Sequence, residues 1–413
     1  MRIPRKRTLI VGGLLMAALL TYGFHGMTAP GWQTISTTFM KNDEPYGGGD
    51  CRIQGNEVIS LKLADPVITF KPVEQRKNPE YAEPTEAWMS NVYEVLNRQT
   101  ISFFRGTVDG GLKRHFQQPG QDAAWWYSKD WGVQYISTSW MDYKVPQPKN
   151  GLSPEITKLW TSRDGGNNWS QLKWPEEQNI GQLLFLDPGR GYAVGWGPRV
   201  WRTADGGRSW KEIRVPELAR DREQPRQRFG GVDLGADGVL RVAYYVEQMG
   251  EVHQSSVVDR LRWDSEAFER EVVLPGQTVV TIQSEQRSPG VYSIYALSRL
   301  GLPRDWNDRT DNGHRTGAIS QWGNYAKPEV RQLHTFDARF TLDGLSVGQR
   351  GILLVYATDA TGEGAPRDFT LASKDYGKSW NETDDGITQG VYFDPATNTQ
   401  YGLYAYTLKK RMW

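Results

Sequence analysis

The chain has 413 residues, and its 49 Lys and Arg residues nearly balance its 48 Asp and Glu residues. This balance gives no global electrostatic argument for nucleic-acid binding, so no nucleic-acid partner is expected. The 17 Trp, 19 Tyr and 44 Gly residues, with only 23% charged residues, describe a turn-rich, aromatic-rich β protein that is long enough to bury a substantial core.

The first 30 residues have the composition of a targeting segment. Basic residues at positions 2, 5, 6 and 7 precede an uncharged run at 8–24. This run is at the lower limit for a membrane-spanning helix and longer than a usual signal-peptide core. We therefore expect residues 1–30 to be a signal anchor or a signal peptide. Because the basic flank belongs on the cytoplasmic side, the rest of the chain is expected at the periplasmic face of a bacterial inner membrane, or in the periplasm if the segment is cleaved.

A linker is predicted at residues 31–57, since the segment 41–49 (KNDEPYGGG) is polar and rich in Gly. From Val58 onward, strand-like runs alternate with turns, so residues 58–413 are assigned to one domain. Cys51 is the single cysteine, which excludes an internal disulfide. The stability of an exported domain must then come from burial of its core.

Three segments share one pattern, in which Asp follows a Ser or Thr by two residues, Gly by four and Trp by seven. They are 160–169 (WTSRDGGNNW), 201–210 (WRTADGGRSW) and 373–380 (SKDYGKSW). Ser, Thr and Asp side chains can accept hydrogen bonds from backbone N–H groups of a turn, and Gly supplies a positive φ. The Trp then enters the returning strand and buries a large ring. The residues given this structural role are Ser162, Asp164, Gly166, Trp169, Thr203, Asp205, Gly207, Trp210, Ser373, Asp375, Gly377 and Trp380.

These segments resemble the Asp-box, or BNR, repeats of sialidase-like β-propellers, in which such hairpins link the outer strands of successive blades. Two weaker copies extend the series: 128–135, with Tyr in place of Trp, and 107–114, with Arg in that place. Since Asp164, Asp205 and Asp375 occupy the same hairpin position in different units, they cannot all converge on one pocket. We interpret them as residues that build the fold.

One complete four-stranded unit is visible at 183–186, 192–196, 200–203 and the hairpin that follows. Residues 391–394 and 401–407 reproduce its first half, and the chain stops where the third strand should finish. We expect a strand from near the N-terminus to complete this last blade and close the ring. The fold prediction is all-β: a propeller with Asp-box hairpins and six to eight blades, seven favoured, preceded by one N-terminal transmembrane or signal helix.

Three stretches are longer than hairpin turns and are candidate binding loops: 141–158, 215–228 and 301–328. The third contains Trp and Arg, which are enriched at interface hot spots, together with Asp and His. The residues predicted to bind a partner are Arg304, Asp305, Trp306, His314, Trp322 and Tyr325.

Catalytic equipment of the sialidase type is not evident. The resemblance implies an arginine triad that begins in an RIP motif, an acid/base carboxylate, and a Tyr nucleophile with a Glu partner. Residues 2–4 spell RIP but lie in the basic flank of the export segment, and residues 52–54 read RIQ. The five His residues are scattered without metal-binding spacing. We therefore predict no catalytic residue, no metal and no cofactor.

Binding is the function that remains for an exported ring of this kind. A basic flank and short anchor before an Asp-box propeller resemble bacterial envelope immunity proteins that neutralise type VI secretion effectors, lipases in particular. The resemblance implies a protein partner such as a secreted toxin, and membrane contact through the N-terminal helix. The alternatives are a sialidase-like glycoside hydrolase, a carbohydrate-binding lectin that uses exposed aromatic side chains, and an assembly factor of a membrane complex.

Overall fold

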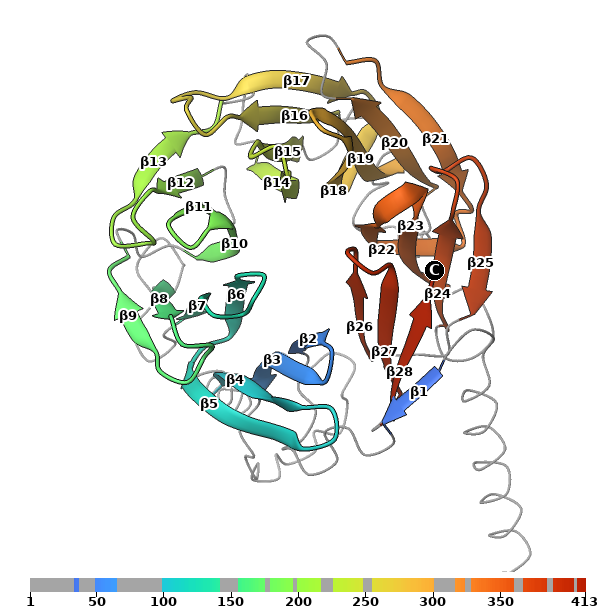
Figure 1. Cartoon of the computed structure of the whole chain (residues 1–413). Helices are drawn as coiled ribbons and strands as arrows, with labels where there is room; N and C mark the ends of the chain where they lie inside the picture. The colour runs from blue at the N-terminus through green and yellow to red at the C-terminus, as the bar shows by residue number, and fades with distance from the viewer. Residues whose placement is uncertain are drawn as a thin grey trace, which may run out of the picture.

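The computed structural model describes residues 33–36, 49–64, 99–141, 155–174, 179–195, 199–216, 226–247, 255–300, 316–323, 328–359, 367–384, 389–404 and 407–413. These residues form seven four-stranded antiparallel sheets, which are arranged as blades around a ring (Figure 1). The favoured prediction of an all-β propeller with seven blades is confirmed.

Within a blade the strands follow one another from the centre of the ring to its rim. Blade 1 contains β2 (Gly49–Gln54), β3 (Glu57–Ala64), β4 (Thr100–Thr107) and β5 (Gly111–Pro119). Blade 2 contains β6 (Asp122–Tyr127), β7 (Gln134–Met141), β8 (Glu155–Ser162) and β9 (Ser170–Leu172). Blade 3 contains β10 (Ile180–Asp187), β11 (Arg190–Gly195), β12 (Arg199–Thr203) and β13 (Lys211–Arg214).

The remaining blades repeat this order. Blade 4 contains β14 (Arg226–Leu234), β15 (Leu240–Glu247), β16 (Ser256–Leu261) and β17 (Glu269–Leu274). Blade 5 contains β18 (Gln277–Ser288), β19 (Val291–Leu300), β20 (Gly317–Gly323) and β21 (Arg331–Phe336). Blade 6 contains β22 (Phe340–Val347), β23 (Leu353–Asp359), β24 (Arg367–Ser373) and β25 (Asn381–Asp384). Blade 7 contains β26 (Gln389–Asp394), β27 (Thr399–Tyr404), β28 (Thr407–Met412) and, at its outer edge, β1 (Gln33–Ser36).

The core lies between adjacent blades. Strand β11 (RGYAVG) is buried at every position after Arg190, because both faces of an inner strand are covered by neighbouring blades. Tyr192 and Val200 of blade 3, for example, share one apolar cluster with Val242 of blade 4. The outer strand β13 (KEIR) instead buries one side chain, Ile213, and exposes the rest. Hydrophobic runs therefore mark the inner strands, and polar alternation marks the rim.

The ring is closed by pairing between the two ends of the described chain. Strand β1 pairs antiparallel with β28, with Gln33 opposite Lys410 and Ser36 opposite Leu408. This confirms the expectation that an N-terminal strand completes the last blade, and it removes the free edge of β28. Strands β1 and β2 both come from residues 31–57, which the sequence analysis assigned to a linker. The propeller thus takes strands from residues before Val58.

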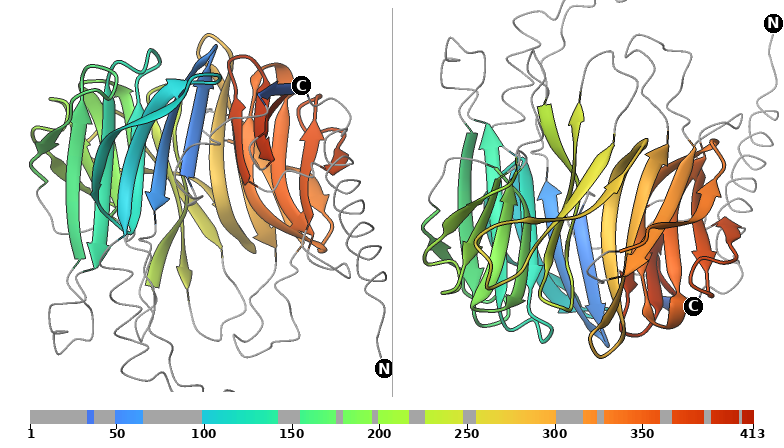
Figure 2. Two further views of the ribbon diagram at one scale, coloured as in Figure 1. Left: turned by 90° about the horizontal axis from the view of Figure 1, so that it is seen from below. Right: turned by 90° about the horizontal axis from the view of Figure 1, so that it is seen from above.

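The two faces of the ring carry different connections (Figure 2). Because successive strands are antiparallel, the turns between first and second strands and between third and fourth strands lie on one face, which we call the hairpin face. The connections between second and third strands, and from one blade to the next, begin and end on the opposite face, which we call the loop face. Strand β28 runs toward the hairpin face, so the C-terminal end of blade 7 lies there.

The predicted signal anchor at residues 1–30 lies outside the described residues. Within the described part of the chain, no helix is long and apolar enough to cross a membrane. The helical element found in it is a single 3-10 turn, η2 (Gln349–Gly351), between β22 and β23.

Candidate functional site

The three segments with the shared sequence pattern form hairpins of one geometry. They join the third and fourth strands within blades 2, 3 and 6, rather than strands of successive blades. In each hairpin the Ser or Thr oxygen accepts a hydrogen bond at 2.8 Å from the backbone N–H of the Gly four residues later. The same hydroxyl group donates to the Asp carboxylate. Side chains therefore hold the turn closed from inside.

The three Asp carboxylates accept hydrogen bonds within their own turns. Asp205 accepts hydrogen bonds from the backbone N–H and the hydroxyl of Ser209, at 2.9 and 2.6 Å, and from Thr203 at 2.9 Å. Desolvation acts to raise the pKa of Asp205, but these bonds outweigh it and keep the pKa below its usual value. Hydrogen bonds from the residue four positions later lower the pKa of Asp164 and of Asp375 to about 2. Each carboxylate is an ionised cap in a different blade.

The tryptophans fill the space toward the preceding blade. Each indole N–H donates to the carbonyl of the Gly three residues earlier, at 2.9 to 3.1 Å. The ring of Trp169 in blade 2 contacts Phe103 of blade 1 edge-to-face at 5.4 Å. The ring of Trp380 in blade 6 contacts Phe336 of blade 5 in the same way at 5.0 Å. These rings lock neighbouring blades together.

Each hairpin is also bonded to the other turn of its own blade. The donor is the N–H of the residue three positions after the Ser or Thr, and it has a positive φ of 65 to 73°. Glycine adopts this conformation without steric cost, whereas Tyr376 adopts it at some cost in strain. The donor and acceptor pairs are Gly165 to Gly132, Gly206 to Gly189 and Tyr376 to Gly351.

The two weaker copies have different places in the fold. Residues 128–135 include the turn between β6 and β7, where Asp130 accepts hydrogen bonds from Ser128 and from the N–H of Gly132. This turn is therefore the bonding partner of the hairpin at 162–169, not a further member of the series. Residues 107–114 do join the third and fourth strands of blade 1, and Thr107 there accepts a bond from the N–H of Gly110.

Among the residues predicted to bind a partner, the structure describes Trp322. Its side chain is 2% exposed on β20 and packs with apolar residues of blades 4 and 5, such as Val258 and Ile294. The structure thus places Trp322 in the core and not on a binding loop. The stretch 301–328 is therefore not one continuous loop, because it contains the core strand β20 (Gly317–Gly323). The other five predicted residues, Arg304, Asp305, Trp306, His314 and Tyr325, lie outside the described residues.

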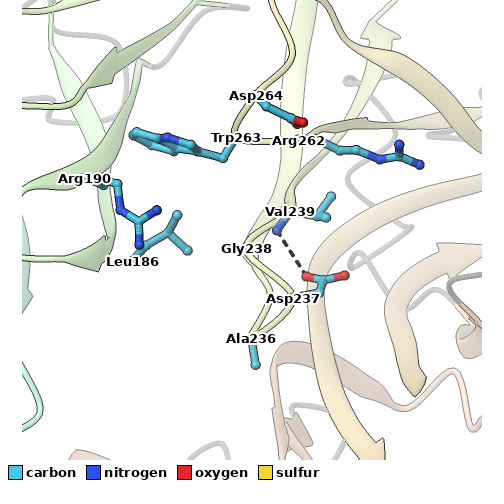
Figure 3. Close-up of a pocket in the computed structure, with 9 residues that line it drawn as sticks. All are labelled: Leu186, Arg190, Ala236, Asp237, Gly238, Val239, Arg262, Trp263 and Asp264. Carbon is cyan, nitrogen blue, oxygen red and sulfur yellow. Dashed lines mark hydrogen bonds between the residues drawn. The ribbon is translucent and has the colours of Figure 1, made fainter. Parts of the chain in front are cut away.

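A pocket of about 610 Å³ opens on the hairpin face between blades 3 and 4 (Figure 3). Three turns form it, those between β10 and β11, β14 and β15, and β16 and β17. Trp263 lies over the opening, with Arg190 and Leu186 on one side and Gly238 and Val239 on the other. The lining residues are Leu186, Arg190, Ala236, Asp237, Gly238, Val239, Arg262, Trp263 and Asp264.

Trp263 is partly exposed but firmly held. Its ring meets Tyr192 edge-to-face at 5.4 Å, and the guanidinium groups of Arg190 and Arg202 lie 5.6 and 5.5 Å from the ring centre. Arg202 also donates to the backbone carbonyl of Trp263 at 2.6 Å. Arg190 is itself positioned by an ion pair with Asp187 at 2.6 Å. The aromatic wall is therefore preorganised by cation–π and hydrogen-bond contacts.

A buried ion cluster adjoins the pocket. Arg241, 1% exposed, pairs with Asp237 at 2.8 Å and with Glu271 at 3.1 Å. Asp237 thus lines the pocket, and its ion pair with the buried Arg241 holds it in position. Asp233 lies close by and accepts a hydrogen bond from Ser284 at 2.6 Å. Although part of its surface remains accessible, the protein around Asp233 desolvates it and raises its pKa to about 6.

The pocket combines an aromatic ring, apolar side chains and charges of both signs. Such a lining suits a polypeptide segment or a small polar ligand. Within the described part of the chain, no group of three or more His, Cys, Asp and Glu side chains is placed to hold a metal ion.

Comparison with known proteins finds likenesses to solved structures at low sequence identity. No family model and no curated protein matches the chain. Among solved structures, YCF48 bound to a D1 peptide aligns with a TM-score of 0.48 at 12% identity, covering 76% of this chain and 88% of that one. YCF48 from Cyanidioschyzon merolae has a TM-score of 0.44 at 14% identity, covering 76% and 92%. Virginiamycin B lyase from Staphylococcus aureus has a TM-score of 0.48 at 11% identity, covering 92% and 99%. The Asp-box and immunity-protein resemblances stay predictions.

Replacing Asp205 with Ala should lower the free energy of unfolding by about 1 to 3 kcal/mol, because the turn loses all of the hydrogen bonds that this carboxylate accepts. Urea unfolding of the purified protein measures the change. Asp264→Ala is the control, since Asp264 is exposed at the pocket edge and its loss should cost about 0.5 kcal/mol or less. Equal stability of Asp205→Ala and the unmodified protein would exclude a building role for Asp205.

Asp233 should make stability depend on pH. Its folded-state pKa of about 6 exceeds the ordinary value of 3.8, so the folded protein binds the proton more tightly than the unfolded chain. The contribution of Asp233 to stability is therefore largest below about pH 4 and is lost as the pH rises through 6. Asp233→Asn mimics the protonated form and keeps an acceptor for Ser284.

We expect Asp233→Asn to match the unmodified protein near pH 4 and to be more stable at pH 7.5 by about 1 to 2 kcal/mol, after allowance for solvent screening. Thermal unfolding of both proteins from pH 4 to pH 7.5 measures this difference. A difference that does not change with pH would contradict the raised pKa.

Proposed function

We propose that this chain is a non-catalytic, protein-binding propeller whose partner inserts a side chain or short segment into the pocket at Trp263. The observation that carries the proposal is the partly exposed Trp263, with Arg190 and Arg262, at a pocket of about 610 Å³. Trp and Arg are enriched at interface hot spots, and such residues act from well-packed pockets.

The rigidity of the pocket supports binding. Its walls are short turns between paired strands, and one of them contains Gly238 with a positive φ of 73°. A partner would therefore meet side chains that are already ordered, which reduces the entropy lost on association. The apolar contacts of Leu186 and Val239 would then exclude water from the polar contacts at the rim.

Two carboxylates at and beside the pocket are committed to the fold, whereas Asp264 at the pocket edge is exposed. Asp237 is held in an ion pair with the buried Arg241. Asp205, on the hairpin between β12 and β13, accepts hydrogen bonds from Ser209 within its own turn. A catalytic acid or base needs a carboxyl group that can reach its substrate with a suitable pKa. These groups are engaged in supporting the fold instead.

The finer proposal is an immunity protein of the bacterial envelope that neutralises a type VI secretion lipase effector. Two features support it: the pocket, and the basic flank with the uncharged run at 2–24. The second feature fits a signal anchor that would export the propeller. A lectin is the second candidate, because a half-exposed Trp beside Arg and Asp side chains can also stack on and hydrogen-bond a sugar ring. A sialidase-like hydrolase and a membrane-complex assembly factor are further alternatives.

The test requires a lipase-type effector of type VI secretion, which is sought among the genes next to this one. The effector is directed to the periplasm of a sensitive bacterium with or without the full chain, and binding of the purified effector is measured by calorimetry. Trp263→Ala should weaken binding by about 2 kcal/mol or more, and Arg262→Ala should weaken it in the same direction. Protection of the cells should fall in parallel.

Arg208→Ala serves as the matched control, because Arg208 is an exposed arginine on the hairpin face of blade 3 that does not line the pocket. Its affinity should equal that of the unmodified protein. Thermal unfolding verifies that each variant is folded. If Trp263→Ala binds as tightly as Arg208→Ala, the pocket is not the binding site. Glycan binding that Trp263→Ala abolishes, with no effector binding, would favour the lectin.

A further inference from the structure

The hairpin face of blade 6 carries three exposed cationic side chains. Of the three patterned hairpins, the one at 373–380 has two exposed lysines, Lys374 and Lys378. The equivalent pairs in the other hairpins are one cation and one neutral residue: Arg163 with Asn167, and Ala204 with Arg208. The exposed Arg350, on turn η2 of the same blade, adds a third positive charge.

Apolar and aromatic groups accompany these charges at the edge of blade 7. Met412 is 71% exposed, which is the largest exposure among the large hydrophobic side chains of the described residues. Next to it, the ring of Trp413 lies 5.6 Å from the ammonium group of Lys374 and 4.1 Å from the guanidinium group of Arg411. We call Arg350, Lys374, Lys378, Met412 and Trp413 the basic rim.

Two carboxylates on this side are bound within their own turns. Asp375 accepts hydrogen bonds from Ser373 and Ser379, and Asp394 accepts them from Thr397 and the N–H of Ala396. Their oxygens are directed into the turns. The outward-facing groups of the basic rim are therefore cations beside a Trp and a Met, a combination typical of surfaces that contact anionic headgroups.

The N-terminal segment reaches the propeller at the same rim. Gln33, the first residue of β1, pairs with Lys410, two residues before Met412. The uncharged run ends at Phe24, and the peptide from there to Gln33 can span at most about 30 Å. A bilayer that holds the run at 8–24 would therefore lie close to the basic rim.

We propose that the basic rim docks on the anionic headgroup surface of the membrane that holds the N-terminal segment. This inference rests on the proposed membrane anchoring. Each lysine or arginine near an anionic bilayer surface adds an attraction that falls off within about 10 Å of the surface at moderate salt. The tether keeps the rim within that range, so that weak contacts suffice for docking.

Docking through this rim has a consequence for the pocket. In Figure 1 blades 3 and 4 lie across the ring from blade 7 and β1. The pocket at Trp263 and the basic rim both lie on the hairpin face, at opposite sides of the ring. A propeller that contacts the bilayer through blades 6 and 7 alone is therefore tilted, with the pocket as the part of this face farthest from the bilayer.

Lysine acylation of the full chain in lipid nanodiscs tests the docking. Discs of phosphatidylglycerol and phosphatidylethanolamine are compared with discs of phosphatidylcholine, and a membrane-impermeant reagent is followed by mass spectrometry. Lys374, Lys378 and Lys410 should react about fivefold more slowly on the anionic discs. Lys129, on the hairpin face of blade 2, should react equally on both and serves as the internal control.

Two variants separate the charge of the rim from the rest of the ring. In Lys374→Glu/Lys378→Glu, the protection of Lys410 should disappear. In Arg163→Glu/Arg208→Glu, which reverses two charges on the patterned hairpins of blades 2 and 3, the protection should persist.

If the chain co-purifies with the discs, the anchor stands. The docking would then be overturned if Lys374, Lys378 and Lys410 reacted equally on both kinds of disc, or if Lys129 were protected as strongly as they are. A chain that does not co-purify with either disc would overturn the anchoring and the docking together. Binding of the effector to the chain in solution tests the pocket separately.

Discussion

The hydrogen bond from a glycine N–H to a Ser or Thr side chain, repeated at 2.8 Å in blades 2, 3 and 6, is the contact on which the hairpin face depends. It closes the turn between the third and fourth strands, and the N–H group of the preceding residue donates to the turn between the first and second strands. Two turns of one blade then behave as one unit. Because backbone groups in both turns are paired, the face needs little further support to stay ordered.

Side chains that cross between blades extend this order around the ring. Arg105 of blade 1 donates to the carbonyl of Gly165 in blade 2 at 2.9 Å, and Tyr135 of blade 2 donates to Gly206 in blade 3 at 3.1 Å. Arg202 of blade 3 continues the series by donating to Trp263 of blade 4. The same kind of contact that ties the blades together thus positions the aromatic wall of the pocket. The candidate site is an extension of the scaffold, and its geometry follows from how the blades are joined.

Much of the fold could be predicted because its signals are local. The turn chemistry of the pattern at 203–210 depends on residues within one hairpin, and the seven-blade estimate depends on the repetition of such units. The boundaries failed where local signals were absent. β1 is four residues long, and its place in blade 7 depends on pairing with a strand at the other end of the chain. Trp322 is predicted to lie in a loop because the stretch 301–328 is longer than a hairpin turn, although neighbouring blades bury its side chain.

The pocket could not be predicted, because its three turns are separate in the sequence and ordinary in composition. Leu186, Gly238 and Trp263 come from two blades, and no spacing rule connects them. What brings them together is the closed ring, in which each blade has a fixed neighbour on either side. The same closure places the start of β1 beside the end of β28, across the ring from the pocket. Ring closure therefore fixes where the candidate binding site lies on the hairpin face relative to the start of β1.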